Sequence, residues 1–88
     1  HVDSFFDLSN EEIVAAYDLL KKCKTRLNEK FKPDAFNVGL NDGKAAGQTV
    51  FHLHIHLIPR YFGDVPDPVG GVRNVIPEKG NYLKNKTV

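Results

Sequence analysis

Apolar residues recur at helical spacing through the first third of the chain. They are Ile13, Tyr17, Leu20, Leu27 and Phe31. Their spacing places them on one face of a helix, where only Lys24 interrupts the stripe. Ser9 and Glu12 form a capping-box pattern that begins a helix, and Pro33 disfavours helical geometry at the residue before it. The pattern predicts a helix over residues 10–31 with one buried face.

Two later segments alternate between apolar and other residues, as half-buried strands do. In residues 35–41, the apolar side carries Phe36, Val38 and Leu40. In residues 50–59, leucine and isoleucine alternate with three histidines. The pattern predicts a strand in each segment.

The segments between and after these strands interrupt regular structure. Residues 43–49 are mostly small, and we expect a flexible loop there. Pro and Gly are frequent after Arg60, which predicts a loop-rich C-terminal segment over residues 63–88. Within it, residues 72–77 could form a short extended piece, and residues 84–88 are expected to fray.

Length, charge and cysteine content narrow the class of protein. Eighty-eight residues fit one small domain. A net charge of +1 gives no global field for binding a nucleic-acid polymer or a membrane, and no apolar run approaches the roughly 18–20 residues of a spanning helix. Cys23 is the single cysteine, and we expect it to be a small buried or half-buried hydrophobe. These features favour a soluble protein of the reducing cytoplasm.

His52, His54 and His56 are the strongest chemical signal in the chain. A strand's period of two places all three on one face. Neutral imidazoles at this spacing could ligate zinc, although no local carboxylate completes such a site. Alternatively, one imidazole is a nucleophile toward phosphorus, with neighbouring histidines and loop amides stabilising the charge. The small residues of 43–49 favour this second interpretation because they let backbone N–H groups approach a phosphate.

Residues 47–60 read GQTVFHLHIHLIPR, which resembles the histidine-triad (HIT) motif, His-φ-His-φ-His-φ-φ with φ apolar, at all seven positions. Residues 41–43 and 57–60 are most similar to the dinucleoside polyphosphate hydrolase, or Fhit-like, branch of that superfamily. The resemblance implies an α+β fold, in which a long helix packs on one face of a largely antiparallel sheet. It also implies a homodimer.

The resemblance further implies roles for individual residues. His54 would attack the α-phosphate of a nucleotide and form a nucleotidyl-histidine, which water then resolves. His56 would contact phosphoryl oxygens or the leaving group, and His52 would support the site. The expected substrate-binding residues are Asn41, Gln48, Thr49 and Val50. Two of them have plainer interpretations, since the asparagine could be a turn residue and the glutamine could brace the loop. Arg60 is expected to be a solvated charge at the strand end.

The implied activity is hydrolysis or transfer at a nucleotide α-phosphate, with a diadenosine polyphosphate of the tetraphosphate type as substrate. Two alternatives stay open: a nucleoside phosphoramidase of the same superfamily, and a non-catalytic nucleotide-binding fragment. The family requires no metal for this chemistry, and Mg²⁺ carried by the polyphosphate is compatible with it.

Members of the superfamily normally begin with an antiparallel hairpin that supplies the nucleoside pocket, and the sequence opens at His1 without one. We therefore expect a single HIT-like domain that is truncated at its N-terminus. Some relatives hold a structural zinc with an upstream Cys-x-x-Cys, the first histidine of the triad and a residue at the position of His1. A zinc role for His1 and His52 would depend on such an upstream pair.

Overall fold

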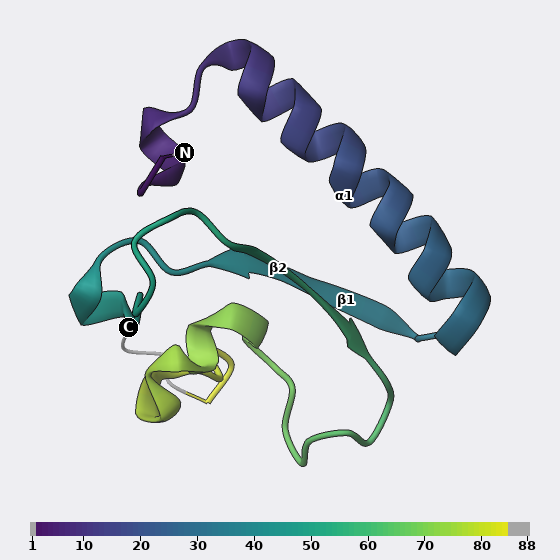
Figure 1. The fold of residues 1–88 in the computed structure, drawn as a ribbon. Helices are drawn as coiled ribbons and strands as arrows, with labels where there is room; N and C mark the ends of the chain where they lie inside the picture. The colour runs from purple at the N-terminus through teal and green to yellow at the C-terminus, as the bar shows by residue number, and fades with distance from the viewer. Residues whose placement is uncertain (1, 85–88) are drawn as a thin grey trace.

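A computed structural model describes residues 2–84 of the chain. Its elements, in chain order, are a 3-10 turn η1 (Phe5–Asp7), the helix α1 (Asn10–Phe31), the strand β1 (Ala35–Leu40), a 3-10 turn η2 (Lys44–Ala46), the strand β2 (Ile55–Arg60) and two further 3-10 turns, η3 (Gly71–Val75) and η4 (Pro77–Lys79). The two strands form an antiparallel ribbon, with α1 on one side and the C-terminal turns on the other (Figure 1). The expected α+β class with an antiparallel sheet is therefore confirmed.

Helix α1 has the bounds that its sequence predicts. The Ser9 hydroxyl accepts a hydrogen bond from the Glu12 N–H at 3.2 Å, and the Glu12 carboxylate accepts one from the Ser9 N–H at 2.9 Å. This backbone donor lowers the pKa of the Glu12 carboxyl. The helix ends where Lys32, immediately before Pro33, adopts a left-handed conformation with φ of 49° and donates its N–H to the Asn28 carbonyl. Both boundaries are thus set by residues close in sequence.

The strands are shorter than their patterns predict. β1 ends at Leu40 and β2 begins only at Ile55, so residues 50–54 are not part of the ladder, contrary to the expected strand over 50–59. The reason is that the six residues of β1 pair with residues 55–60, and the chain turns away after Leu40. The Leu53 N–H instead donates to the Val2 carbonyl at 2.8 Å.

The two faces of the ribbon differ in character. Phe36, Val38 and Leu40 pair with Pro59, Leu57 and Ile55, which makes the face toward α1 apolar. A groove on this side is lined by α1 and by the apolar residues of the histidine segment, and its lining includes Ala16, Leu20, Cys23, Leu53, Ile55 and Leu57. The helix therefore packs on the apolar face of the sheet.

The apolar residues of the helix stripe are more exposed than the sequence predicts. No hydrophobic side chain among residues 2–84 is fully buried, and Tyr17 and Phe31 are 58% and 50% exposed. Cys23 is also exposed, which corrects the expectation of a buried or half-buried thiol. The cause is the width of the sheet, because two strands about 5 Å apart cannot cover a helix face that runs over six turns.

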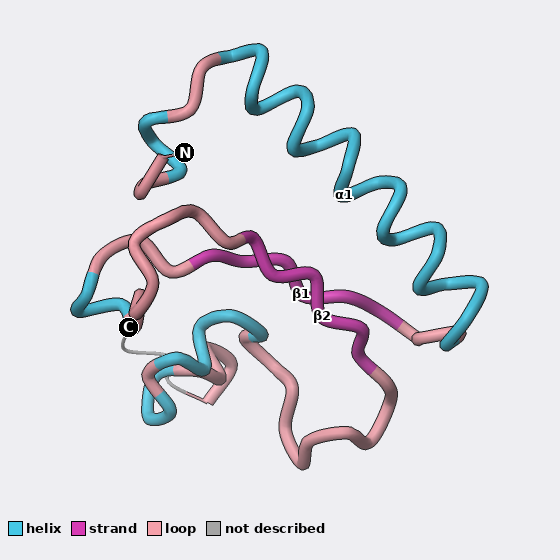
Figure 2. The backbone as a smooth tube through the Cα atoms, viewed as in Figure 1, coloured by secondary structure: helices cyan, strands magenta, loops and turns pink. Residues whose placement is uncertain are grey.

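The C-terminal segment forms turns where residues 72–77 were expected to be extended. Gly70 and Gly71 adopt positive φ angles of 94° and 53°, which start η3, and Pro77 starts η4. The Asn74 side-chain amide donates to the Val69 and Gly71 carbonyls at 3.3 and 3.1 Å, which closes η3 on itself. η3 contacts β1, on the side of the sheet opposite α1 (Figure 2).

Two predictions concern residues that lie partly outside the described part of the chain. His1 and residues 85–88, which include most of the predicted tail, are not among the described residues. Across residues 2–84, no helix has both the length and the apolar character needed to cross a membrane.

Candidate functional site

The histidine segment keeps its alternation beyond the end of the regular strand. His52, His54 and His56 are exposed, whereas the intervening Leu53 and Ile55 are half-buried. The imidazole rings of His52 and His54 meet edge to face, with centroids 5.1 Å apart. Because the apolar residues face the groove beside α1, the histidines lie on the other side. His56 therefore lies on the polar face of the sheet, and His52 and His54 are exposed in the segment that leads into it.

His56 is the only one of the three within β2, where it pairs with Gly39 of β1. His56 and Asn41 line the same open pocket between the sheet and η3. His52 and His54 lie just before β2, next to the loop that precedes it. The structure therefore brings Asn41 together with the last histidine of the triad, while the first two histidines contact each other.

Gln48 holds the loop before the histidines. Its side-chain oxygen accepts a hydrogen bond from the Gly43 N–H at 2.8 Å, and its amide nitrogen donates to the Asp3 and Val50 carbonyls at 2.9 and 3.3 Å. Both amide hydrogens are engaged by the protein. The bracing role considered from the sequence is what the geometry shows, and a contact of Gln48 with phosphate remains a prediction.

The backbone of this loop is partly closed on itself. The N–H groups of Ala46 and Gln48 donate to the Gly43 carbonyl, and that of Gly47 donates to the Lys44 carbonyl, at 3.0 to 3.1 Å. Gly43 and Gly47 make this turn possible with φ of 98° and 93°. The early part of the loop is therefore a hydrogen-bonded turn, in which the N–H groups of Ala46, Gly47 and Gln48 are already used within the protein.

The later part of the loop is more accessible. Thr49 and Val50 are exposed, and within residues 2–84 their N–H groups donate to no protein acceptor. Asn41 lies beside the loop, since its amide nitrogen is 3.8 Å from the position that a Cβ on Gly47 would occupy. The accessible backbone donors of this loop are therefore the N–H groups of Thr49 and Val50.

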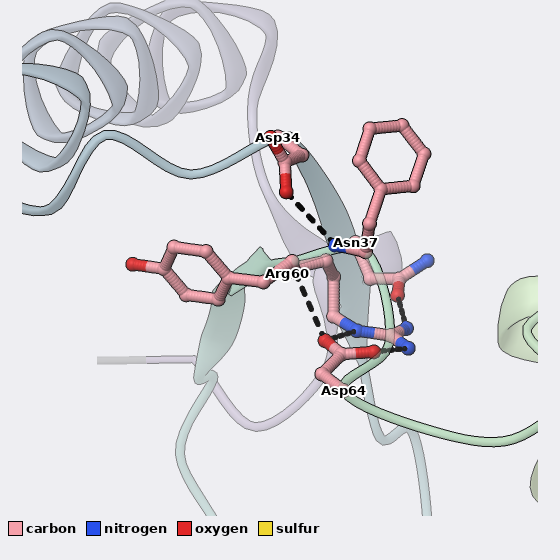
Figure 3. A network of polar contacts seen from close by, with 6 residues as sticks. Asp34, Asn37, Arg60 and Asp64 are labelled. Carbon is pink, nitrogen blue, oxygen red and sulfur yellow. Dashed lines mark hydrogen bonds and ion pairs between the residues drawn. The ribbon is translucent and has the colours of Figure 1, made fainter.

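Arg60 is engaged by the protein rather than solvated, which corrects the expectation of a free strand-end charge. Its guanidinium donates to both carboxylate oxygens of Asp64 at 2.7 and 2.8 Å, and also to the Asn37 side-chain oxygen (Figure 3). The Tyr61 N–H donates to Asp64, and the Phe62 N–H to Asp34. The Arg60 guanidinium holds the pKa of the Asp64 carboxyl well below its usual range. We call Asn37, Arg60 and Asp64 the arginine clamp.

Sequence reasoning missed Asn37 and Asp64 as structural residues. The spacing of four between Arg60 and Asp64 is a signal that could have suggested an ion pair across the turn at Gly63. The link from Arg60 to Asn37 has no local signal, because it depends on the register of the two strands.

No group of three or more His, Cys, Asp and Glu side chains within residues 2–84 is arranged to hold a metal ion. Of the two histidines that a zinc site would use, His1 lies outside the described residues. A zinc role for His1 and His52 therefore stays a hypothesis.

A long helix on one face of an antiparallel sheet defines the chain as an α+β protein, and its alternating histidines lead into the opposite, polar face. Known proteins place the chain within this class. The model of the HIT domain family matches residues 1–63. The chain belongs to the HIT domain family.

Individual relatives agree with this assignment. The chain is 38% identical over 58 residues to the asymmetrical bis(5'-nucleosyl)-tetraphosphatase of Schizosaccharomyces pombe, covering 66% of this chain and 32% of that protein. It is 41% identical over 54 residues to the bis(5'-adenosyl)-triphosphatase of Dictyostelium discoideum, covering 61% of this chain and 36% of the relative. The solved Plasmodium falciparum diadenosine triphosphate hydrolase superimposes with a TM-score of 0.66 at 32% identity, covering 96% of this chain and 54% of that one. The chain thus spans roughly a third to a half of the length of these relatives.

Proposed function

We propose that the protein cleaves a dinucleoside polyphosphate at its α-phosphate through a covalent nucleotidyl-histidine formed on His54. The observation that carries this proposal is that His54 is exposed and follows, along the chain, the exposed residues Thr49 and Val50, whose N–H groups donate to no protein acceptor within residues 2–84. Membership of the HIT domain family and the two polyphosphate-cleaving relatives support the same chemistry.

The reaction would proceed in two balanced steps. A ring nitrogen of His54 donates its electron pair to the α-phosphorus, the phosphorus–oxygen bond to the leaving phosphate breaks, and the departing oxygen takes a proton from the His56 imidazole. Water then attacks the same phosphorus and gives a proton back to His56, the phosphorus–nitrogen bond breaks with its electron pair returning to His54, and the nucleoside monophosphate leaves. The N–H groups of Thr49 and Val50 and the Asn41 amide would stabilise charge on the phosphoryl oxygens.

Gln48 has an indirect role in this proposal, because its amide is already bonded to Gly43, Asp3 and Val50. By fixing the Val50 carbonyl, it would hold the neighbouring N–H groups toward the phosphate. His52 would orient His54 through the edge-to-face contact of their rings. The protein would need no resident metal for these steps and would act as a homodimer.

The test is turnover of diadenosine tetraphosphate by the full-length protein and its His54→Ala variant. Because His54 is exposed, the substitution should leave the fold intact while abolishing turnover, a loss of at least about 10³-fold for removal of a nucleophile. Val65→Ala, in the loop after the arginine clamp, is a control that should keep full activity. Undiminished turnover by the His54 variant would rule the mechanism out.

Two further readouts separate the alternatives. A nucleotide labelled at its α-phosphate should leave label on the wild-type protein and none on the His54 variant, whereas a non-catalytic binder would trap no label. Rates on an adenosine phosphoramidate and on diadenosine tetraphosphate then decide between a phosphoramidase and a polyphosphate hydrolase.

A further inference from the structure

Gly39 occupies the middle of β1 without any local need for a glycine. Its φ is not positive, and its pairing with His56 continues the ladder without a bulge. A Cβ built at this position would meet no atom within 4 Å. A glycine inside a strand lowers stability, and it otherwise marks a bulge, a bend or the close approach of another molecule. The ladder has no bulge at Gly39, and the space beside it is open, so another molecule could approach the strand closely at this position.

The space above Gly39 is part of a pocket. The pocket lies between the polar face of the sheet and η3, and its volume is about 370 Å³, within the roughly 300–1,000 Å³ of small-molecule sites. Its polar side chains are those of Asn37, Asn41, His56 and Asn74. Three branched apolar side chains complete it and are exposed to solvent, with exposed fractions of 49% for Ile58, 58% for Val72 and 85% for Val75.

The position of the pocket relative to the triad decides what it would hold. Its lining includes His56 but neither His54 nor His52. In the proposed reaction, His54 takes the nucleotide that stays on the protein and His56 faces the group that departs. With His56 in that role, a group bound in the pocket beyond it would be attached to the departing phosphate.

From these observations we infer that the pocket bounded by Gly39, Ile58, Val72 and Val75 binds the nucleoside of the leaving group, whose flat base would lie over Gly39 against the valines of η3. This inference rests on the proposed function, and it makes Gly39 and Val75 determinants of specificity for substrates with a second nucleoside. Apolar side chains around a few polar groups are the usual composition of such a site.

Two variants of the full-length protein test the inference. Gly39→Val fills the space over the strand, and it should fold because valine favours strands and a Cβ there meets no atom. Val75→Asp places a charge on the opposite wall at an exposed position. Val65→Asp is the matched control, since it makes the same change in the same segment outside the pocket lining.

The substrates are diadenosine tetraphosphate and adenosine 5'-tetraphosphate, which differ only by the second adenosine. We expect each pocket variant to raise KM for the dinucleotide by about tenfold, as loss of one modest contact would. KM for the mononucleotide should stay within twofold of the wild-type value, and Val65→Asp should change neither. Equal effects on both substrates, or no effect on either, would overturn the inference.

A binding measurement separates this inference from the proposed reaction. Calorimetry with a non-hydrolysable methylene analogue of diadenosine tetraphosphate reports the pocket without any chemistry. Weaker binding of the analogue by Gly39→Val, with unchanged binding of the mononucleotide, would support the pocket even if no label is trapped on His54. Unchanged binding of the analogue would contradict the inference about the pocket. It would not affect the proposed role of His54, which the labelling experiment tests.

Discussion

Gln48 shows how a single amide can organise a loop that has almost no side chains of its own. It joins the start of the loop at Gly43 to its end at Val50 and to the N-terminal segment at Asp3. The loop between them is held by only three short-range backbone bonds. The conformation of the chain just before the histidines therefore depends on this side chain.

We predict that Gln48→Ala lowers the free energy of unfolding by about 1–3 kcal/mol, because the half-buried Gly43 N–H loses its acceptor and two carbonyls lose a donor. Hydrogen exchange at the Gly43 amide should accelerate in the same variant. Thr49→Ala, one residue away and exposed, is the control and should change neither quantity. Full protection of the Gly43 amide in Gln48→Ala would show that the brace is unimportant.

At the scale of elements, the arginine clamp links three parts of the fold. Asn37 is in β1, Arg60 ends β2 and Asp64 belongs to the loop that leads to η3. Gly71 lies close to the same asparagine, since a Cβ there would be 3.3 Å from the Asn37 amide nitrogen. The clamp thus fixes where the C-terminal turns sit on the polar face.

The clamp makes stability depend on pH in a defined direction. Because the Arg60 guanidinium lowers the Asp64 pKa in the folded protein, Asp64 stabilises the fold fully above about pH 4, its ordinary pKa. That contribution is lost as the pH falls from about 4 toward the lowered pKa of Asp64 in the folded protein. We therefore predict that Asp64→Asn is less stable than the wild type at pH 6, and that the difference narrows between about pH 4 and pH 2.

Chemical denaturation at a series of pH values measures this difference. Asp67→Asn is a useful comparison, because Asp67 also has a lowered pKa, caused first by its hydrogen bond from Asn81, but lies outside the clamp. A gap between Asp64→Asn and the wild type that stays constant down to pH 2 would contradict the assignment.

The elements also show what the sequence could and could not predict. The helix was predicted to its last residue because its cap, its proline and its periodicity are all local. The start of β2 was placed five residues too early, because alternation continues through residues 50–54 while the ladder depends on the length of β1. The turns of η3 were missed because the Asn74 bonds that close them leave no pattern of spacing.

The same distinction applies to the site. The alternating histidines and the small loop are visible in the sequence, and their sidedness follows from the period of a strand. The pocket beside His56 is not visible, since it requires η3 to fold back across β1. Gly39 carried the one local hint, as a glycine within an otherwise regular strand pattern.

The whole molecule is loosely built for its length. Its radius of gyration is 15.2 Å, against about 12 Å for a compact domain of this size. Within the described residues, many large apolar side chains are at least half exposed along α1, including Val14, Tyr17 and Leu19. The apolar groove between α1 and the sheet is open to solvent.

We predict that the 88-residue chain, expressed alone, binds 8-anilinonaphthalene-1-sulfonate and unfolds over a broad range of denaturant, since little of its apolar surface is removed from water. Leu19→Ser and Tyr17→Ser should reduce dye binding without broadening the transition further. Fluorescence titration and urea denaturation followed by circular dichroism measure both effects. A sharp transition without dye binding would contradict the prediction.

Two glycines let the C-terminal turns pack closely against each other. Gly80 is buried, and a Cβ on it would collide with Asn74, just as a Cβ on Gly70 would collide with the Gly80 carbonyl. Val72 and Val75 take no part in this tight crossing and line the open pocket beside His56. Substitutions at these two valines would therefore change the wall of the pocket while the backbone that carries them stays unchanged.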